Sequence, residues 1–494
     1  MLVEGRAQEK KETRRDVLLL QVAALESEMA QKRLRLYSEI NTLSPIDQLP
    51  AEIKTEIFYN ALGSLVNSEC QEYSEWQGIY PFFLGKICRS WRDFVWSTPI
   101  LWTTLHLCLS KDKYEAQTYL LHDWLSRISN LPISFCLDTE ESLDEWDSHC
   151  PPTKVLTTLA SISSQWKHAE LFVPDIKACF DAISTAGKSL PLLTTASIRL
   201  PLSVRQLNLS AAPKLSVLHL FNPYLSMVLV PWHQLRKFFV NGCNMDEIRI
   251  FFHNAPQIVH CIFTDIEPVI LDRSLDLNLF HPLVLEHLKY LKLGFDTVLG
   301  DSANWILGPA KLPSLRKVSL SGPFASSATA TVLLQIMQAF RSSQLLEDFT
   351  FSYEIPSDII LIQVLELIPS IKTLLLSFTH TNQHSLLEAL LQRLYCPRDV
   401  LLPNLQNFSY HGPTSLNEHM HLFRDVLVYR FRQCASLSKE VGSEQKTVSQ
   451  IQSVIVGTPS QLVISPDIQE ELDSLRRDGL NLSVTSHQHR ALYN

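Results

Sequence analysis

A short apolar pattern repeats along residues 166–494, and it limits what the chain can fold into more than any other feature. Each copy has the form apolar-x-x-apolar-x-apolar, whose second half alternates as a short strand with one buried face does. Five copies carry proline two residues before their first apolar residue, and proline ends a preceding element. The clear copies begin at Leu215, Leu235, Ile258, Leu288, Leu315, Leu346, Ile371, Leu405 and Ile451, and weaker ones begin at Trp166 and Leu193.

Helical patterns separate several of these copies. Apolar residues recur at helical spacing over 332–340 and 386–394, and a third helical pattern spans 417–432. Alternation of strand and helix at a near-regular period predicts an α/β solenoid, with parallel strands on one face and helices on the other. The first apolar residues lie from 20 residues apart (Leu215 to Leu235) to 46 residues apart (Leu405 to Ile451), so the repeats vary in length.

The region resembles leucine-rich repeats. One copy matches the full form of that repeat, with a cysteine at the position that asparagine or cysteine usually takes: Leu235-x-x-Phe238-x-Val240-x-x-Cys243-x-Met245. Two other copies depart from the regular form, because their equivalent positions hold Ile266 and Pro323. The resemblance implies a solenoid that binds other proteins.

The stretch from 44 to 107 has a helical pattern instead. Leu49, Ile53 and Ile57 mark one face of a first short helix, and Pro50 stands where a helix tolerates proline in its first turn. A second helix is predicted over 82–94, with apolar residues at Leu84, Ile87, Cys88, Trp91 and Phe94. Two helices this short cannot enclose a core alone. A third element or a partner chain must cover them, and the polar residues 67–80 between them are predicted to form a surface loop.

This stretch resembles an F-box, and its tail resembles the expanded F-box families of mushroom-forming fungi. The matching motifs are Leu49-Pro50-x-Glu52-Ile53, Ile57-Phe58, Cys88-Arg89-x-Trp91-Arg92 and Thr98-Pro99-x-Leu101-Trp102. The resemblance implies docking on a Skp-family adaptor and, through it, on a cullin in an SCF-type ubiquitin ligase. The adaptor-binding residues that it implies are Leu49, Pro50, Ile53, Ile57, Phe58, Ile87, Cys88 and Trp91.

Residues 1–43 form a charged helical pattern, with an apolar seam that Lys32 and Glu39 interrupt. This helix either packs on its own chain or is left solvated, or it forms a weak coiled coil with another chain. The predicted organisation is therefore a charged amphipathic helix (1–43), an F-box-like domain (44–107), a connecting region with an acidic loop (108–165) and a leucine-rich-repeat-like solenoid (166–494).

Composition excludes several classes of protein. A net charge of −8 lacks the basic footprint of a nucleic-acid binder, and the ten cysteines include no Cys-x-x-Cys pair that would indicate a zinc site. Charged residues dominate the first sixteen positions, and no apolar run is long enough to cross a membrane. We expect a cytoplasmic or nuclear protein without metal or cofactor.

Catalytic motifs are absent from the sequence. It contains no His-Glu-x-x-His, Gly-x-Ser-x-Gly or Gly-x-Gly-x-x-Gly. The run Gly187-Lys188-Ser189 ends like a phosphate-binding loop, but Ala182 stands where the first glycine belongs. We therefore expect no catalytic residues and no enzymatic activity, although a hydrolase or transferase with a dispersed site remains an alternative.

The strand residues that alternate with the buried ones should line an exposed sheet face. Lys237, Phe239, Tyr290, Lys292 and Lys317 fall there, and such a basic and aromatic patch would suit an acidic client segment. Ordinary solvated charge is the alternative. The function expected from all these features is client recognition for an SCF-type ligase. The alternative function is a scaffold outside any ligase, in which the helical pair only caps the repeats.

Overall fold

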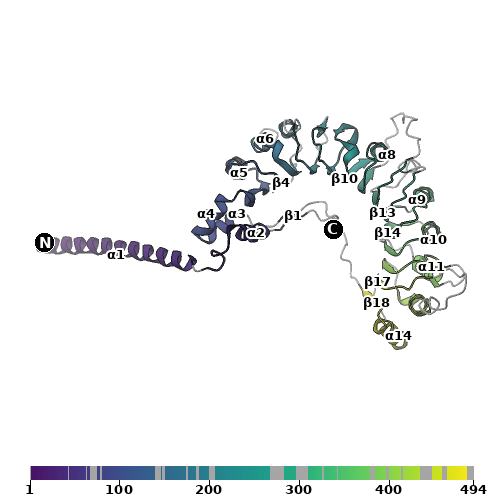
Figure 1. Ribbon diagram of the computed structural model, residues 1–494. Coiled ribbons are helices and arrows are strands. Elements are labelled where there is room, and N and C mark those ends of the chain that lie inside the picture. The colour runs from purple at the N-terminus through teal and green to yellow at the C-terminus, as the bar shows by residue number, and fades with distance from the viewer. Residues whose placement is uncertain are drawn as a thin grey trace. The chain divides into compact units, whose positions relative to one another are not determined.

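The computed structural model divides into two compact units (Figure 1). The first unit comprises Met1–His106 and Thr118–Phe135, and the second comprises Leu107–Gln117 and Cys136–Asn494. The structure describes residues 2–486 except 43, 63, 67–74, 78–80, 140–145, 147–150, 174–175, 185–188, 200–205, 268–282, 296–306, 308–309, 325–326, 342, 356, 379–383, 396–399, 413–415, 434–447 and 459–463.

The first unit is mainly helical. It contains one long helix, a set of short helices and a two-stranded antiparallel sheet of β1 and β2. Most of the predicted loop at 67–80 lies outside the described residues. The elements are α1 (Leu2–Thr42), α2 (Ala51–Ala61), β1 (Ser64–Val66), β2 (Glu75–Gln77), α3 (Pro81–Ile87), α4 (Arg89–Ser97) and η1 (Pro99–Trp102), and β3 (Thr104–Leu109), α5 (Tyr114–Ile128) and β4 (Ile133–Thr139) cross between the units.

The second predicted helix is in fact two helices, α3 and α4. Cys88 separates them because its backbone is extended, with φ −155° and ψ 171°. Its Sγ then accepts a hydrogen bond from the Trp91 backbone N–H at 3.4 Å, so Cys88 is the N-cap of α4. The prediction missed this break because cysteine is compatible with an apolar helical face. Pro50 likewise stands just before α2, as its N-cap residue, and not in the first turn.

Tryptophan rings form the core of the first unit. Trp102 and Trp124 are buried with ring centroids 4.8 Å apart, and the Trp124 indole N–H donates to the Trp102 carbonyl at 2.7 Å. The ring of Phe82 lies 5.4 Å from both. Gly85 is needed beside this cluster, since a Cβ there would lie 2.2 Å from the ring of Trp96. Packing of this kind lets so small a unit enclose a core.

Parallel strands build the second unit. They belong to a 14-stranded sheet with the order β18-β17-β16-β15-β14-β13-β12-β11-β10-β8-β6-β5-β4-β3, and the described pairs from β5 to β18 are parallel. A separate small sheet pairs β7 (Leu207–Asn208) with β9 (Val228–Leu229). The strands are β5 (Trp166–Leu171), β6 (Thr195–Arg199), β8 (Val217–Phe221), β10 (Lys237–Asn244), β11 (His260–Glu267), β12 (Tyr290–Phe295), β13 (Lys317–Pro323), β14 (Asp348–Glu354), β15 (Thr373–Phe378), β16 (Asn407–His411), β17 (Ser453–Thr458) and β18 (Asn481–Ser486).

Helices lie along one side of this row of strands, as α8, α9, α10 and α11 do in Figure 1. The Phe238 ring of β10 stacks 4.3 Å from Phe251 of α8, which shows that the apolar anchors of the strands face the helices. The helices are α6 (Thr153–Ser161), α7 (Lys177–Ser184), α8 (Met245–Asn254), α9 (Ser327–Phe340), α10 (Asp358–Glu366), α11 (His384–Tyr395), α12 (Met420–Val428), the π-helix η10 (Tyr429–Gln433) and α14 (Pro466–Arg477).

The repeat pattern is confirmed strand by strand. Every clear copy places its second and third apolar residues on one strand of the sheet, from Leu218 and Leu220 on β8 to Val454 and Val456 on β17. All the apolar anchors of these copies are between 0% and 4% exposed. Ile266, which stands where the regular repeat has asparagine or cysteine, pairs in register with Cys243 of the preceding strand. Both side chains are buried.

The sheet extends beyond the predicted solenoid at its N-terminal end. Residues 108–165 were predicted to be a connection, but they contain the whole of α5, β4 and α6, and the sheet includes β3 and β4. The acidic run of this region begins at Asp138, but Asp138 and Thr139 belong to β4, and residues 140–145 lie outside the described residues. The last strand, β18, was not predicted.

Candidate interaction surfaces

Two isoleucines of α2 are exposed although the first unit has a completed core. Ile53 is 50% exposed and Ile57 is 41% exposed, and their spacing of four residues places them on one face of the helix. Pro50 is exposed beside them and Leu49 is half-buried. Four of the predicted adaptor-binding residues therefore lie at or near the surface of this helix.

Phe58 is one of the predicted adaptor-binding residues, but its side chain is buried. It is 1% exposed, and its ring lies 4.5 Å from Trp91 and 5.6 Å from Phe94. These two rings of α4 cover Phe58, so it supports α2 from the inside and cannot contact a partner. Trp91 is half-buried through the same contact.

The third helix also exposes apolar side chains. Ile87 is 61% exposed, and Phe83, one turn earlier on the same face, is 51% exposed. Phe83 was not predicted, although its spacing of four residues from Ile87 was visible in the sequence. Cys88 is half-buried and serves as the α4 cap described above.

A polar contact holds α2 against the start of α4. The Lys54 ammonium, in an 8% exposed residue, lies 3.3 Å from the Asp47 carboxylate and 5.2 Å from the centre of the Phe94 ring. The Ser90 hydroxyl donates to the same Asp47 oxygen at 3.2 Å. Lys54 and Phe58, four residues apart, form the buried side of α2, and this leaves Ile53 and Ile57 exposed.

The second unit presents the sheet face that points away from the helices, called the open face below. Its residues form rows across the strands, and one row runs Lys237, His260, Tyr290, Lys317 and Asp348 from β10 to β14. The parallel row runs His219, Phe239, Ile262, Lys292 and Ser319 from β8 to β13. All five predicted client-binding residues therefore lie on one face of the sheet, on β10, β12 and β13.

Aromatic rings and histidines are in contact along these rows. His219 lies 4.1 Å from Phe239, Phe239 lies 5.4 Å from His260, and His260 lies 4.3 Å from Tyr290, measured between ring centroids. The Lys317 ammonium lies 5.4 Å from the centre of the Tyr290 ring, at cation–π distance. His219 and His260 were not among the predicted residues, although each occupies an outward position of the same repeat.

Positive charge gathers at the β12 and β13 end of the open face. Lys289 and Arg316 precede these strands and Lys292 and Lys317 lie within them. Within the described part of the chain, Lys289, Lys292 and Lys317 form no ion pair. The sign changes at the next strand, where the Glu347 carboxylate accepts a hydrogen bond from Lys372 at 2.8 Å. That hydrogen bond lowers the pKa of Glu347.

Burial controls the titratable groups at the other end of the sheet. Burial lowers the pKa of His219 to about 4, against a smaller opposite effect of Glu170, so its imidazole is neutral at pH 7. His168 contacts the buried Glu170 at 2.7 Å. Burial also raises the pKa of Cys179 to about 12 and that of Cys136 well above its ordinary value. Both thiols are therefore protonated at neutral pH and act as small core side chains.

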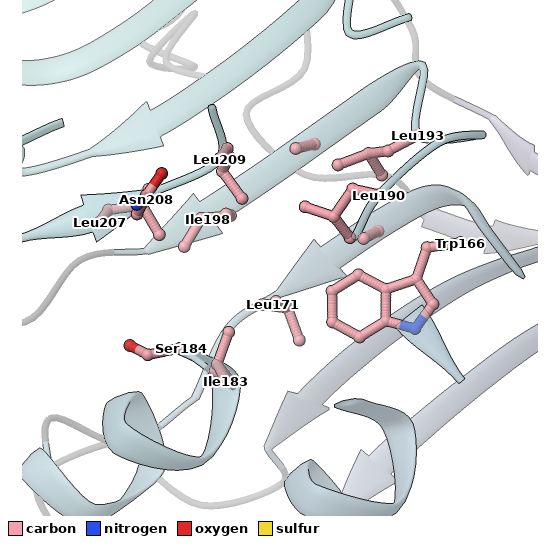
Figure 2. Close-up of a pocket in the computed structure, with 12 residues that line it drawn as sticks. Trp166, Leu171, Ile183, Ser184, Leu190, Leu193, Ile198, Leu207, Asn208 and Leu209 are labelled. Carbon is pink, nitrogen blue, oxygen red and sulfur yellow. The ribbon is translucent and has the colours of Figure 1, made fainter. Parts of the chain in front are cut away.

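A small pocket lies among β5, β6 and α7 (Figure 2). Its volume is about 20 Å³, which is space for roughly one water-sized sphere. The lining is apolar apart from Ser184 and Asn208, and none of the lining residues is titratable. Figure 2 shows Trp166, Leu171, Ile183 and Leu190 around this gap. It is a packing gap in the core and offers no groups for chemistry.

Across the described ranges, no group of three or more His, Cys, Asp and Glu side chains is placed to hold a metal ion. A helix long and apolar enough to cross a membrane does not occur in that part of the chain either.

Comparison with known proteins finds no matching family model and no matching curated protein. Solved structures do match. An internalin from Listeria monocytogenes is 13% identical with a TM-score of 0.28, over 59% of this chain and 78% of the internalin. TLR13 in its complex with ssRNA13 is 12% identical with a TM-score of 0.24, over 70% of this chain and 55% of TLR13.

The architecture of the second unit stands on its own geometry. One parallel strand per repeat, sequential strand order and buried apolar anchors define a leucine-rich-repeat-type solenoid.

Proposed function

We propose that this protein is the client-recognition subunit of an SCF-type ubiquitin ligase. In this proposal the first unit docks on a Skp-family adaptor, and the open face of the solenoid binds the client. The observation that carries it is the exposure of Ile53, Ile57 and Ile87 on helices whose unit already has a buried core. The F-box resemblance of residues 49–102 supports the same function.

Exposure of these side chains has a physical cost that a partner would remove. An isoleucine transferred fully from water to an apolar contact contributes about 1.5–3 kcal/mol. Single exposed apolar residues are ordinary, but pairs on one helix face are the anchors with which helices dock into apolar grooves. Ile53 with Ile57 and Phe83 with Ile87 are two such pairs.

The open face suits a client segment that carries carboxylates or other anions. Lys292 and Lys317 would bind the anions, and the rings of Phe239 and Tyr290 would cover an apolar or aromatic neighbour. The protein would contribute no catalytic group in this proposal. It would raise the effective concentration of the client beside a ubiquitin-loaded enzyme, in the cytoplasm or nucleus.

The adaptor test compares faces of one helix. We would replace Ile57 by Glu, and as a matched control replace Tyr59 by Glu, because Tyr59 is 44% exposed but lies about 160° away, on nearly the opposite side of α2. A Skp-family adaptor should co-purify with the wild type and with Tyr59→Glu but not with Ile57→Glu. If the wild type does not bind the adaptor, the ligase proposal is wrong and the protein is a scaffold of another kind.

The client test compares the two sides of the solenoid. Lys292→Glu with Lys317→Glu reverses charge on the open face, and Arg341→Glu reverses charge after α9 on the helical side. Proximity labelling by the wild type and by Arg341→Glu should mark the same set of client proteins, and the open-face variant should fail to label that set. A client set that is the same for all three proteins would exclude the open face as the recognition surface.

A further inference from the structure

The long helix α1 carries an apolar seam that its own chain does not cover. Every described side chain from 14 to 37 is exposed. The seam residues Leu18, Val22, Leu25, Met29 and Leu36 are between 50% and 59% exposed. Figure 1 shows α1 as one continuous helix. A helix this long in water needs packing against another surface, because most helical stability comes from a buried apolar face.

The seam follows a heptad repeat, in which positions a and d alternate at steps of four and three. Val22, Met29 and Leu36 occupy position a, and Leu18 and Leu25 occupy position d. Lys32 and Glu39 occupy the two later d positions. The most exposed of the described leucines, Leu20 at 71% and Leu34 at 69%, fall at the outermost position f.

The polar seam positions distinguish between the two possible orientations of a second helix. A parallel, in-register pair would bring Lys32 against Lys32 and Glu39 against Glu39, which places like charges inside the seam. An antiparallel pair centred between residues 30 and 31 instead places Lys32 opposite Met29 and Glu39 opposite Val22, while Leu25 meets Leu36. The antiparallel arrangement avoids both like-charge contacts.

The flanking charges favour the same orientation. Glu26 and Arg33 occupy position e, and Glu28 and Arg35 occupy position g. Antiparallel helices pair e with e and g with g, so Glu26 meets Arg33 and Glu28 meets Arg35. Each contact occurs twice by symmetry, which makes four attractive pairs. A parallel dimer would form only the Glu28–Arg33 contact, twice. Such flanking pairs set partner and orientation in coiled coils.

We propose that α1 forms an antiparallel coiled coil with α1 of a second copy of this chain. The charge pattern identifies the occupant of the seam, since Glu26 and Glu28 complement Arg33 and Arg35 of the same sequence. The polar residues in the seam make the dimer weak, with dissociation in the micromolar range. The Thr42 ends of the two helices would lie about 35 Å apart along the axis, from a rise of about 1.5 Å per residue. The dimer is independent of adaptor binding.

The first experiment measures the mass of the full chain by sedimentation equilibrium across the micromolar range. The wild type should move from the mass of one chain towards twice that mass. Leu25→Glu with Met29→Glu should keep the single-chain mass, and the control Leu20→Glu with Leu34→Glu should behave as the wild type. A wild type that stays at the single-chain mass, or equal dissociation of both double variants, would overturn the proposal.

The second experiment measures orientation. A spin label carried by a non-natural amino acid at Arg14 avoids the ten natural cysteines. Antiparallel pairing places the two labels about 50 Å apart, whereas parallel pairing places them within about 20 Å, given the helix rise and the spacing of packed helices. The short distance would refute the antiparallel arrangement. Circular dichroism of each variant would verify that α1 remains helical.

Discussion

The exposed isoleucines of the first unit make adaptor binding a quantitative prediction. We consider the single substitutions Ile53→Ala, Ile57→Ala and Ile87→Ala. Each removes an exposed side chain that would contact the adaptor, and none of these side chains belongs to the Trp102 and Trp124 core. The three variants should therefore fold as the wild type does and differ only in adaptor affinity.

The expected magnitude follows from the fraction of each side chain that is still exposed. Full burial of isoleucine is worth about 1.5–3 kcal/mol, so the 61% exposed Ile87 offers up to about 0.9–1.8 kcal/mol. By the same rule Ile53, at 50%, offers up to about 0.8–1.5, and Ile57, at 41%, up to about 0.6–1.2 kcal/mol. The three together amount to about 2.3–4.5 kcal/mol, or roughly a 50-fold to 2,000-fold loss of affinity if they add.

The assay is calorimetric titration of each variant with a purified Skp-family adaptor. The affinity losses should follow the order Ile87, Ile53, Ile57, and Tyr59→Ala should bind as the wild type does. Thermal denaturation of each variant is the control for folding. If Tyr59→Ala weakens binding as much as Ile57→Ala, the docking face is not the one inferred here. If all three isoleucine variants bind unchanged, α2 and α3 are not the docking helices.

Three further predictions concern stability. Phe58→Ala removes the ring that packs on Trp91, and chemical denaturation should show the free energy of unfolding reduced by about 3–5 kcal/mol. The pKa of His219 is lowered from 6.5 to about 4 in the folded protein, so as the pH falls the unfolded chain binds a proton at this residue first. The free energy of unfolding should therefore decrease by up to about 3 kcal/mol as the pH falls from 6.5 to 4. His219→Phe should lack this decrease. The buried Arg430 guanidinium donates to three backbone carbonyls, and Arg430→Ala should lower the free energy of unfolding by at least about 3 kcal/mol. Unchanged denaturation curves would contradict each.

The solenoid was predictable because its strands obey a period of two. The anchors from Leu215 onward are apolar wherever the structure buries them, and proline marks where many copies begin. The missed strands show where this signal fails. Before β18 the first apolar position holds Gly479, which has a positive φ of 108°. The strand β3 does match the repeat, as Trp102-x-x-Leu105-x-Leu107, but Trp102 also ends the helical module.

The apolar positions of the first unit were predictable by residue type, but which of them face the solvent was not. Ile57 and Phe58 are neighbours, both large and apolar, and no periodicity of so short a helix decides which of them faces inward. The rings of Trp91 and Phe94 decide it, because they close over Phe58. These contacts join residues more than thirty positions apart, so they follow from the tertiary fold. His219 and His260, by contrast, share the outward register of the predicted lysines.

The residues that stabilise each unit differ from those proposed for recognition, which makes the proposed function testable without unfolding the protein. The solenoid anchors are at most 4% exposed, while Lys292 and Lys317 on the same strands reach the surface. Phe58 and Ile57 are divided in the same way within one turn of α2. Because buried contacts carry most of the free energy of folding, changes at the outward positions should leave the thermal midpoint within about a degree or two. A surface substitution that abolishes binding at an unchanged midpoint therefore reports on recognition, whereas a Phe58 substitution cannot separate recognition from folding.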